Sequence, residues 1–397
     1  MTYFSIVVVA IMVVFALGGI IDTAFLKDKW GLGPEFRRGI EMIGPLCLSI
    51  VGIIAFVPEI AWLIEHTLST LYELMGLDPS MAVTSILAID MGGYQLAMAV
   101  AKDQTIGQWA GIVYGSMMGA TIVFSIPVGL SAIKKEDVSL FAKGTLFGIA
   151  AIPLGTFVGG LMMGIPVITI LKNLIIPCVL SLIIIVCLAL WPKGTTRVFS
   201  WFSKGVTVFG FLALGIAMFN DLVLTPIANT GAFDMSKVPF FRLLDSCSSG
   251  IGVAGSVGLV LSGALPFIYC LNKVIKKVSS KRKKAVKGTE AGKTGFLLSA
   301  ANNMAMFSQL EYMSDREKIL NVAFSVCGAF VIGDHLAFTA GNAPELIGPM
   351  MVSKLVGAAF ALLFAFIFTR NMKAKTTNEE QSVSEISTVS SINIKEN

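Results

Sequence analysis

Charged side chains are scarce in this sequence. Only 14% of its 397 residues are Asp, Glu, Lys or Arg, whereas 55% are hydrophobic. Soluble globular domains carry about 25% charged residues, so this composition excludes a large soluble domain. The apolar residues occur in runs of about 20, which is the length that crosses a bilayer as a helix. The composition therefore indicates a polytopic membrane protein.

The residue patterns of common metal sites and enzymes are missing as well. The chain has two histidines, and its six cysteines lie in or beside apolar segments without metal-ligand spacing. It contains no H-E-x-x-H, G-x-S-x-G or Walker motif. An intramembrane aspartyl protease is disfavoured, because its second motif requires Gly-x-Gly-Asp and Val331 occupies the first of these positions. We therefore expect no enzyme, cofactor or metal.

Eleven apolar segments can be marked along the chain. Their residues lack the alternation of membrane β-strands, so we expect an all-α protein. The segments are residues 2–22, 42–62, 81–101, 109–133, 141–163, 167–191, 205–224, 245–271, 294–313, 319–340 and 346–369. They place a transmembrane domain at residues 1–370. The Ser-, Thr-, Asn- and Glu-rich residues 371–397 predict a disordered cytoplasmic tail.

The basic residues indicate which segments cross the membrane. If residues 81–101 and 294–313 enter and leave on one face, nearly all loop Lys and Arg fall on one side, as the positive-inside rule requires. Eleven plain crossings would divide these residues almost evenly. The charges therefore favour nine full crossings, two re-entrant segments and an N-terminus outside. Eleven crossings are the alternative.

The two re-entrant segments also resemble each other. When they are aligned, Asp90 falls on Asn302, and further along the chain Gly119 falls on Gly328. Residues 42–163 and about 250–369 therefore look like two copies of one unit, with opposite orientations in the membrane. Inverted repeats with broken segments that meet near the midplane recur in transporters.

Both units contain polar residues at membrane depth, where such residues usually serve a solute, an ion or a proton. The candidate site residues are Asp90, Tyr94, Gln95 and Ser125 in the first unit, and Asn302, Asn303, Asp334 and His335 in the second. Gly92, Gly93 and Gly333 beside the acids permit broken helices. Lys354 lies in an apolar segment and requires either a path to the membrane surface or a buried ion pair.

Each candidate also has a structural interpretation. The Asp90 carboxylate suits a cationic solute or a coupling cation, but it could instead accept hydrogen bonds from exposed backbone. Asp334 and His335 could form a proton relay or a cation site, or could hold two helices together. Asn302 and Asn303 could face an ammonium or a hydroxyl group, or could cap a re-entrant tip.

Four stretches carry a resemblance to a known family. They are Asp90-Met-Gly-Gly-Tyr94, Tyr114-Gly-Ser-Met-Met-Gly-Ala-Thr-Ile-Val-Phe-Ser-Ile-Pro127, Ala300-Ala-Asn-Asn303 and Gly333-Asp-His-Leu-Ala-Phe338. Through them the chain resembles the ethanolamine permeases of bacterial ethanolamine-utilisation operons, from about residue 1 to residue 370. Two departures are Ala120-Thr121, where a proline is expected after Met-Met-Gly, and Met304-Ala305, where Ile-Pro is expected.

The resemblance implies a multi-pass permease of the bacterial inner membrane. It would import ethanolamine, in its protonated form, for a cytosolic cobalamin-dependent ammonia-lyase pathway. The expected partners are protonated ethanolamine and the lipid bilayer, without nucleic acid. The question whether the protein forms a homo-oligomer is left open. The alternatives are a transporter of another small organic cation and a membrane sensor or scaffold that transports nothing.

Polarity alone suggests a role for each candidate residue. We expect Asp90 to neutralise the ammonium group of the substrate. The expected neighbours of the hydroxyl group are Tyr94, Ser125, Asn302 and Asn303. Asp334 and His335 would line the site or couple it to pH.

Overall fold

The computed structural model describes residues 3–67, 72, 74–231, 244–281, 289–370 and 372. Every regular element in these residues is a helix, which confirms the all-α fold. The first half contains α1 (Tyr3–Phe25), α2 (Gly33–Glu41), α3 (Ile43–Ala55), α4 (Val57–Thr67), α6 (Ser80–Thr84), η1 (Ile89–Gly93), α7 (Tyr94–Val100), α8 (Gln104–Gln108), η2 (Trp109–Tyr114), α9 (Met118–Ala120), η3 (Thr121–Ser125), α10 (Ile126–Ala132), η4 (Lys135–Asp137), α11 (Val138–Met162), α12 (Val167–Asn173) and α13 (Ile175–Leu190). The second half contains α14 (Pro192–Phe219), η5 (Asn220–Leu224), α15 (Thr225–Asn229), α16 (Cys247–Lys281), α17 (Glu290–Ala301), α18 (Asn303–Phe307), η7 (Leu310–Tyr312), α19 (Asp315–Gly328), α20 (Asp334–Asn342), η8 (Pro344–Leu346) and α21 (Ile347–Phe368).

Eight helical stretches of the described chain are long and apolar enough to cross a membrane. They are Tyr3–Phe25, Gly33–Ala55, Gln104–Ala132, Lys135–Met162, Val167–Leu190, Pro192–Asn229, Cys247–Val274 and Pro344–Phe368. These eight coincide with eight of the predicted apolar segments. The other three, residues 81–101, 294–313 and 319–340, are each broken into shorter helices. The predicted nine to eleven segments therefore consist of eight long spans and three broken ones.

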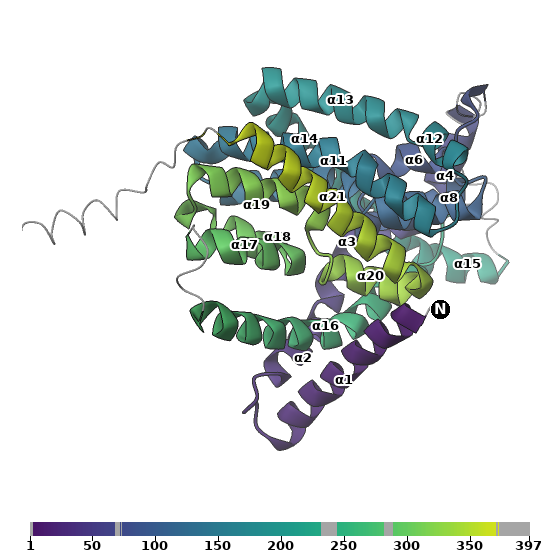
Figure 1. Cartoon of the computed structure of the whole chain (residues 1–397). Helices are drawn as coiled ribbons and strands as arrows, with labels where there is room; N and C mark the ends of the chain where they lie inside the picture. Colours follow the sequence, from purple (N-terminus) through teal and green to yellow (C-terminus); the bar gives the residue numbers. More distant parts are fainter. Residues whose placement is uncertain are drawn as a thin grey trace, which may run out of the picture.

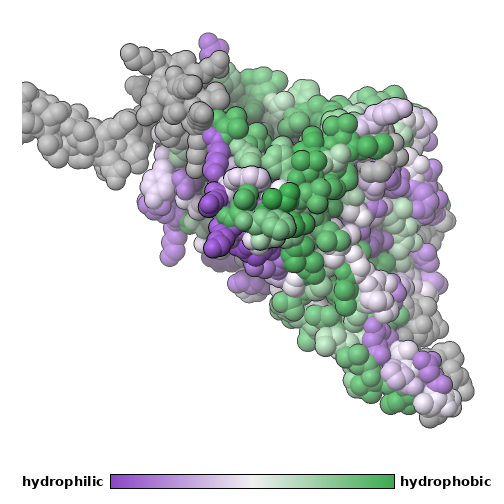
Figure 2. Space-filling view, turned by 90° about the horizontal axis from the view of Figure 1, so that it is seen from below, coloured by the Kyte–Doolittle hydropathy of each residue, from purple (hydrophilic) through white to green (hydrophobic). Residues whose placement is uncertain are grey.

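The surface of the molecule fits a lipid environment. Figure 2 shows hydrophobic residues across the middle of the visible face and hydrophilic residues gathered toward both sides. Large apolar side chains such as Val14 on α1, Leu182 on α13 and Leu212 on α14 are exposed. An exposed apolar surface of this extent is unfavourable in water and favourable against lipid tails. The fold is therefore that of a polytopic membrane protein.

Residues 81–101 form a hairpin whose two ends lie together. The Asp78 carboxylate accepts hydrogen bonds from the backbone N–H groups of Lys102 and Asp103, at 3.0 and 3.2 Å. Its other oxygen accepts a bond of 2.9 Å from the N–H of Ser80, at the start of α6. The segment therefore returns to the end of the molecule where it began, as the basic residues predict.

Residues 294–313 form a second hairpin of the same kind. The Glu317 carboxylate accepts hydrogen bonds from the N–H groups of Thr289, before α17, and Ser314, after α18, at 2.7 and 2.9 Å. Partial burial raises the pKa of Glu317, but the hydrogen bonds from Ser314 and Thr289 outweigh this and lower the pKa overall. The carboxylate therefore binds both ends of the hairpin as an anion.

The two hairpins open at opposite ends of the span Gln104–Ala132, which is about 40 Å long at 1.5 Å per residue. The span starts where the first hairpin ends. Just beyond its other end, Lys134 forms a 3.1 Å ion pair with Glu311, at the end of the second hairpin, and holds the pKa of Glu311 below its usual range. A 2.7 Å ion pair between Asp137 and Lys318 lies beside it. Figure 1 accordingly shows α6 and α17 on opposite sides of the molecule.

Each hairpin packs closely against a broken helix, and a glycine lies at each of these contacts. A side chain at Gly119 would collide with the carbonyl oxygen of Leu87, and one at Gly333 would collide with that of Ala301. The same contact thus occurs once in each predicted unit. It pairs Gly119 with Gly333, and not with Gly328 as in the sequence alignment. The inverted repeat itself stays a prediction.

Two predicted features fall largely outside the described residues. These are the basic stretch Lys281-Arg282-Lys283-Lys284, of which only Lys281 is described, and the tail 371–397, of which only Met372 is described. The helices α11 and α21, which end the two predicted units, pack closely because Gly155 lies against Gly357.

Gly333→Ala is expected to destabilise the protein. Its Cβ would meet a backbone carbonyl that cannot rotate away, and overpacking of this kind costs about 1–3 kcal/mol. Thermal unfolding of the purified protein in detergent measures the loss. Gly255→Ala on α16 is the matched control, because a Cβ there meets no atom within 4 Å. Equal stability of the two variants would contradict the role of this contact.

Candidate functional site

Asp90 lies at the turn of the first hairpin. Two residues before it, Ala88 has an extended backbone with ψ of 153°. Two residues after it, Gly92 has a left-handed φ of +79°. Glycine adopts this φ without strain because it has no Cβ. The chain therefore reverses here, and it leaves the side chain of Asp90 half-buried inside the molecule.

Asp334 lies at the second break, as the first residue of α20. Before it, Phe330 has a left-handed φ of +59°, which is unusual for a bulky residue and costs about 1–3 kcal/mol. The N–H of Phe330 donates a 3.0 Å hydrogen bond to the carbonyl of Ser299, and its ring lies 5.0 Å from that of His335. These contacts hold the break in one conformation. An acid in the first turn of α20 is also favourable for the helix dipole.

The fold brings these two acids together. The turn η1 packs against α20, and Asp90 and Asp334 lie close enough to interact electrostatically. The ring of Tyr94 meets that of Phe338 edge to face at 6.0 Å, which fixes α7 against α20. Two like charges in a poorly hydrated site repel each other, so a cation between them would be favourable. Asp90, Tyr94 and Asp334, three predicted site residues from the two units, therefore lie in one region of the molecule.

His335 and Gln95 supply unpaired polar atoms. His335 is only 2% exposed, and neither its Nδ1 nor the buried Oε1 of Gln95 has a hydrogen-bond partner in the described chain. A buried unpaired group of this kind costs about 1–3 kcal/mol, which a bound ligand can recover. No hydrogen bond joins Asp334 to His335 among the described contacts, and adjacent residues on a helix point about 100° apart.

Asn302, Asn303 and Ser125 use their polar groups within the protein. The Asn302 Oδ1 caps α18 by accepting a 2.8 Å bond from the N–H of Met304. The fully buried Asn303 accepts a 2.6 Å bond from the Ser299 hydroxyl, and its Nδ2 donates a 3.0 Å bond to the Ser125 hydroxyl. The Asn303–Ser125 bond therefore joins the two predicted units. Neither bond reaches the acids.

Lys354 is a further polar residue of the interior, and it is not among the site residues predicted from the sequence. It is fully buried, and its ammonium donates a 2.7 Å hydrogen bond to the carbonyl oxygen of Ser116. Ser116 lies between η2 and α9, where the span Gln104–Ala132 is interrupted. The sequence marked Lys354 as unusual because a charged residue lies in an apolar segment. It did not reveal that the Ser116 carbonyl is its hydrogen-bond acceptor.

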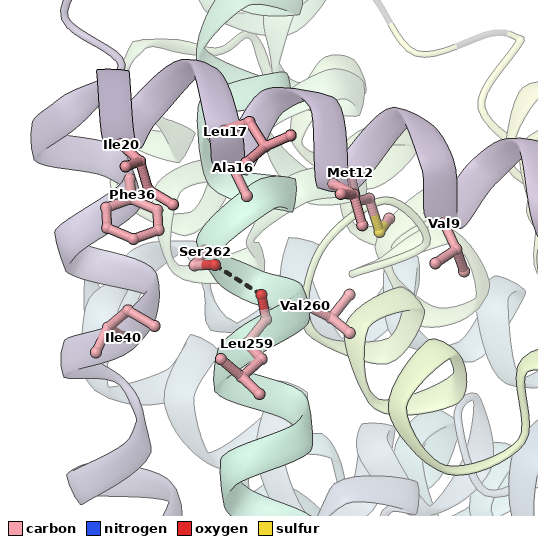
Figure 3. Close-up of a pocket in the computed structure, with 11 residues that line it drawn as sticks. Val9, Met12, Ala16, Leu17, Ile20, Phe36, Ile40, Leu259, Val260 and Ser262 are labelled. Atoms are coloured by element: carbon pink, nitrogen blue, oxygen red, sulfur yellow. Dashed lines mark hydrogen bonds between the residues drawn. The ribbon is translucent and has the colours of Figure 1, made fainter. Parts of the chain in front are cut away.

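An apolar groove lies elsewhere, between α1, α2 and α16. Figure 3 shows that its labelled lining is almost entirely hydrophobic, and its volume is about 350 Å³. Its only polar side chain, Ser262, bonds the Leu259 carbonyl at 2.7 Å. None of the candidate site residues lines it. Among the described residues, no three His, Cys, Asp or Glu side chains are grouped to hold a metal ion.

Comparison with known proteins bears on this arrangement. The family model described as "Ethanolamine utilisation protein, EutH" matches residues 4–368. The chain belongs to this family. A "Probable ethanolamine permease EutH" of Listeria monocytogenes is 39% identical over 94% of this chain and 97% of its own length. Proteins with the same name from Escherichia coli and Salmonella typhimurium are both 33% identical, over 90% of this chain and 90% and 91% of their own lengths. No solved structure matches the chain.

Family membership agrees with the fold. The relatives are named probable ethanolamine permeases, and the described chain has eight helices able to span a membrane. The chain is therefore a multi-pass bacterial membrane protein of a transporter family, and not an enzyme. The departures at Ala120 and Met304-Ala305 leave the breaks in place, because α9 and α18 still begin after interrupted backbone.

Ser125→Ala is expected to destabilise the protein by about 1–3 kcal/mol, because it leaves the buried Nδ2 of Asn303 without its acceptor. Thermal unfolding measures the change. Ser131→Ala is the control, since the exposed Ser131 hydroxyl bonds only the Val128 carbonyl in its own helix. If both variants unfold at the same temperature, the Asn303–Ser125 bond does not hold the units together.

Proposed function

We propose that this protein imports protonated ethanolamine, and that Asp90 and Asp334 bind its ammonium group. The observation that carries the proposal is the convergence of these two acids from separate broken segments. Ionisable groups are costly at membrane depth and usually serve a solute or an ion there. The relatives named probable ethanolamine permeases make ethanolamine the first candidate.

The chemistry of the substrate matches the groups around the acids. Protonated ethanolamine has three N–H donors and a hydroxyl that both donates and accepts. The two carboxylates suit the ammonium, because charge-assisted hydrogen bonds are the stronger kind. The unpaired Gln95 Oε1 and His335 Nδ1 are buried acceptors for the hydroxyl. Tyr94 would close the site beside them, while Ser125, Asn302 and Asn303 would act as its scaffold.

Transport would proceed by alternating access between two inverted units. Supporting this, the hairpins open at opposite ends of the span Gln104–Ala132, and each packs on a broken helix through a glycine contact. The ion pairs Lys134–Glu311 and Asp137–Lys318 join the units at one end. Discontinuous segments that meet between inverted units are the usual setting for such sites.

Asp90→Asn and Asp334→Asn are each expected to weaken ethanolamine uptake by about 10- to 100-fold. A hydrogen bond to a charged group contributes about 1.5–3 kcal/mol, and both substitutions keep the shape of the side chain. The measurement is uptake of radiolabelled ethanolamine by proteoliposomes, with the amount of folded protein checked by gel filtration.

Asp103→Asn is the matched control for both variants. Asp103 is exposed and caps α8 through the N–H groups of Thr105 and Ile106, a role that Asn fills equally well. Full uptake by both acid variants would refute the proposed site. A folded wild-type protein that moves another amine instead would favour a different small cation, and one that moves none would favour a sensor or scaffold.

The predicted topology can be tested with single cysteines at Thr105 and Ser314, which follow the two hairpins. With the N-terminus outside, we expect a membrane-impermeant thiol reagent to label Thr105→Cys from outside and Ser314→Cys from inside. The background should lack the native cysteines. Labelling of position 105 only from inside would mean that residues 81–101 cross the membrane.

A further inference from the structure

Lys354 is a buried charge that ethanolamine binding does not by itself require. The side chain, on α21, is fully buried and reaches the Ser116 carbonyl at 2.7 Å. An ammonium group has three donors, yet this is the hydrogen bond described for it. No carboxylate of the described residues forms an ion pair with Lys354.

The hydrogen bond to Ser116 does not explain why this residue is charged. A carbonyl oxygen accepts equally from a neutral amide, and burying an ammonium without a directly paired anion is unfavourable. A glutamine could therefore close the break between η2 and α9 at a lower desolvation cost. An ionised Lys354 is therefore favourable only if a negative charge in the interior balances it.

The nearby acids provide that balance. The helix α21 packs against α20 and η2, and η1 also packs against both, so Lys354, Asp90 and Asp334 lie on elements in mutual contact. Lys354 interacts electrostatically with Asp90, which in turn interacts with Asp334. With both carboxyl groups and the ammonium ionised and His335 neutral, the formal charge of this group is −1. One singly charged cation neutralises this group of side chains, whereas a doubly charged cation would leave an excess positive charge in a poorly hydrated region.

We propose that Lys354 is a specificity-determining residue, which limits the site to amines with one positive charge. This inference rests on the proposed function, because it requires Asp90 and Asp334 to hold the substrate. Ethane-1,2-diamine is the natural probe. It has the length of ethanolamine and, at mildly acidic pH, carries a second ammonium in place of the hydroxyl. A neutral residue at position 354 leaves a formal charge of −2, which suits this dication.

The test compares two amines as inhibitors of radiolabelled ethanolamine uptake in proteoliposomes at mildly acidic pH. For the wild-type protein we expect ethane-1,2-diamine to require a concentration at least about tenfold higher than unlabelled ethanolamine. In Lys354→Gln, whose amide can still donate to Ser116, this ratio should fall by about tenfold or more. Lys354→Arg should keep the wild-type ratio.

Lys143→Gln is the matched control, since Lys143 is an exposed residue of α11 and should not affect the ratio. An unchanged ratio in folded Lys354→Gln would overturn the inference and leave ethanolamine import intact. Absence of ethanolamine uptake by the wild-type protein would instead overturn the proposed function. If Lys354→Gln does not fold, the wild-type protein still decides, because equal inhibition by the two amines refutes charge selection.

Discussion

Backbone groups that are freed where a helix stops inside a membrane must find partners within the protein, and the rest of this structure depends on that constraint. Each interruption is closed by another part of the chain. Asn302 caps α18, the ammonium of Lys354 takes the Ser116 carbonyl, and the N–H of Ile332 bonds the Ala300 carbonyl at 3.1 Å. The broken segments are therefore held in place by side chains and backbone.

These closures also explain where the polar residues gather. A hairpin that turns back inside the molecule brings its tip to the interior, and a broken helix begins anew beside it. Asp90 stands at such a tip and Asp334 at such a restart. The contact of Gly119 with Leu87 and that of Gly333 with Ala301 press tip and break together in both units. The proposed cation site would thus be a consequence of the way in which the two broken elements pack.

Several features could be predicted from the sequence because they depend on local composition. The scarcity of charge identified the membrane, and the uneven distribution of Lys and Arg singled out residues 81–101 and 294–313 as the segments that turn back. Acids within apolar runs likewise marked Asp90 and Asp334. The alignment of the two units was less accurate, because apolar residues match one another easily and Gly119 was paired with Gly328.

The sequence by itself determined that this protein lies in a membrane, that it is helical and which polar residues lie within its apolar segments. Each of these follows from the hydrophobicity of a short stretch of the chain. Only the tertiary structure decided which partners those residues have. Ser125 and Asn303 are 178 positions apart yet hydrogen-bonded, and Lys354 reaches a carbonyl 238 positions away. Such pairings depend on the packing of distant helices, which local composition does not encode. They distinguish the polar residues that are paired within the interior from those, such as Gln95 and His335, whose buried polar atoms have no hydrogen-bond partner in the described chain.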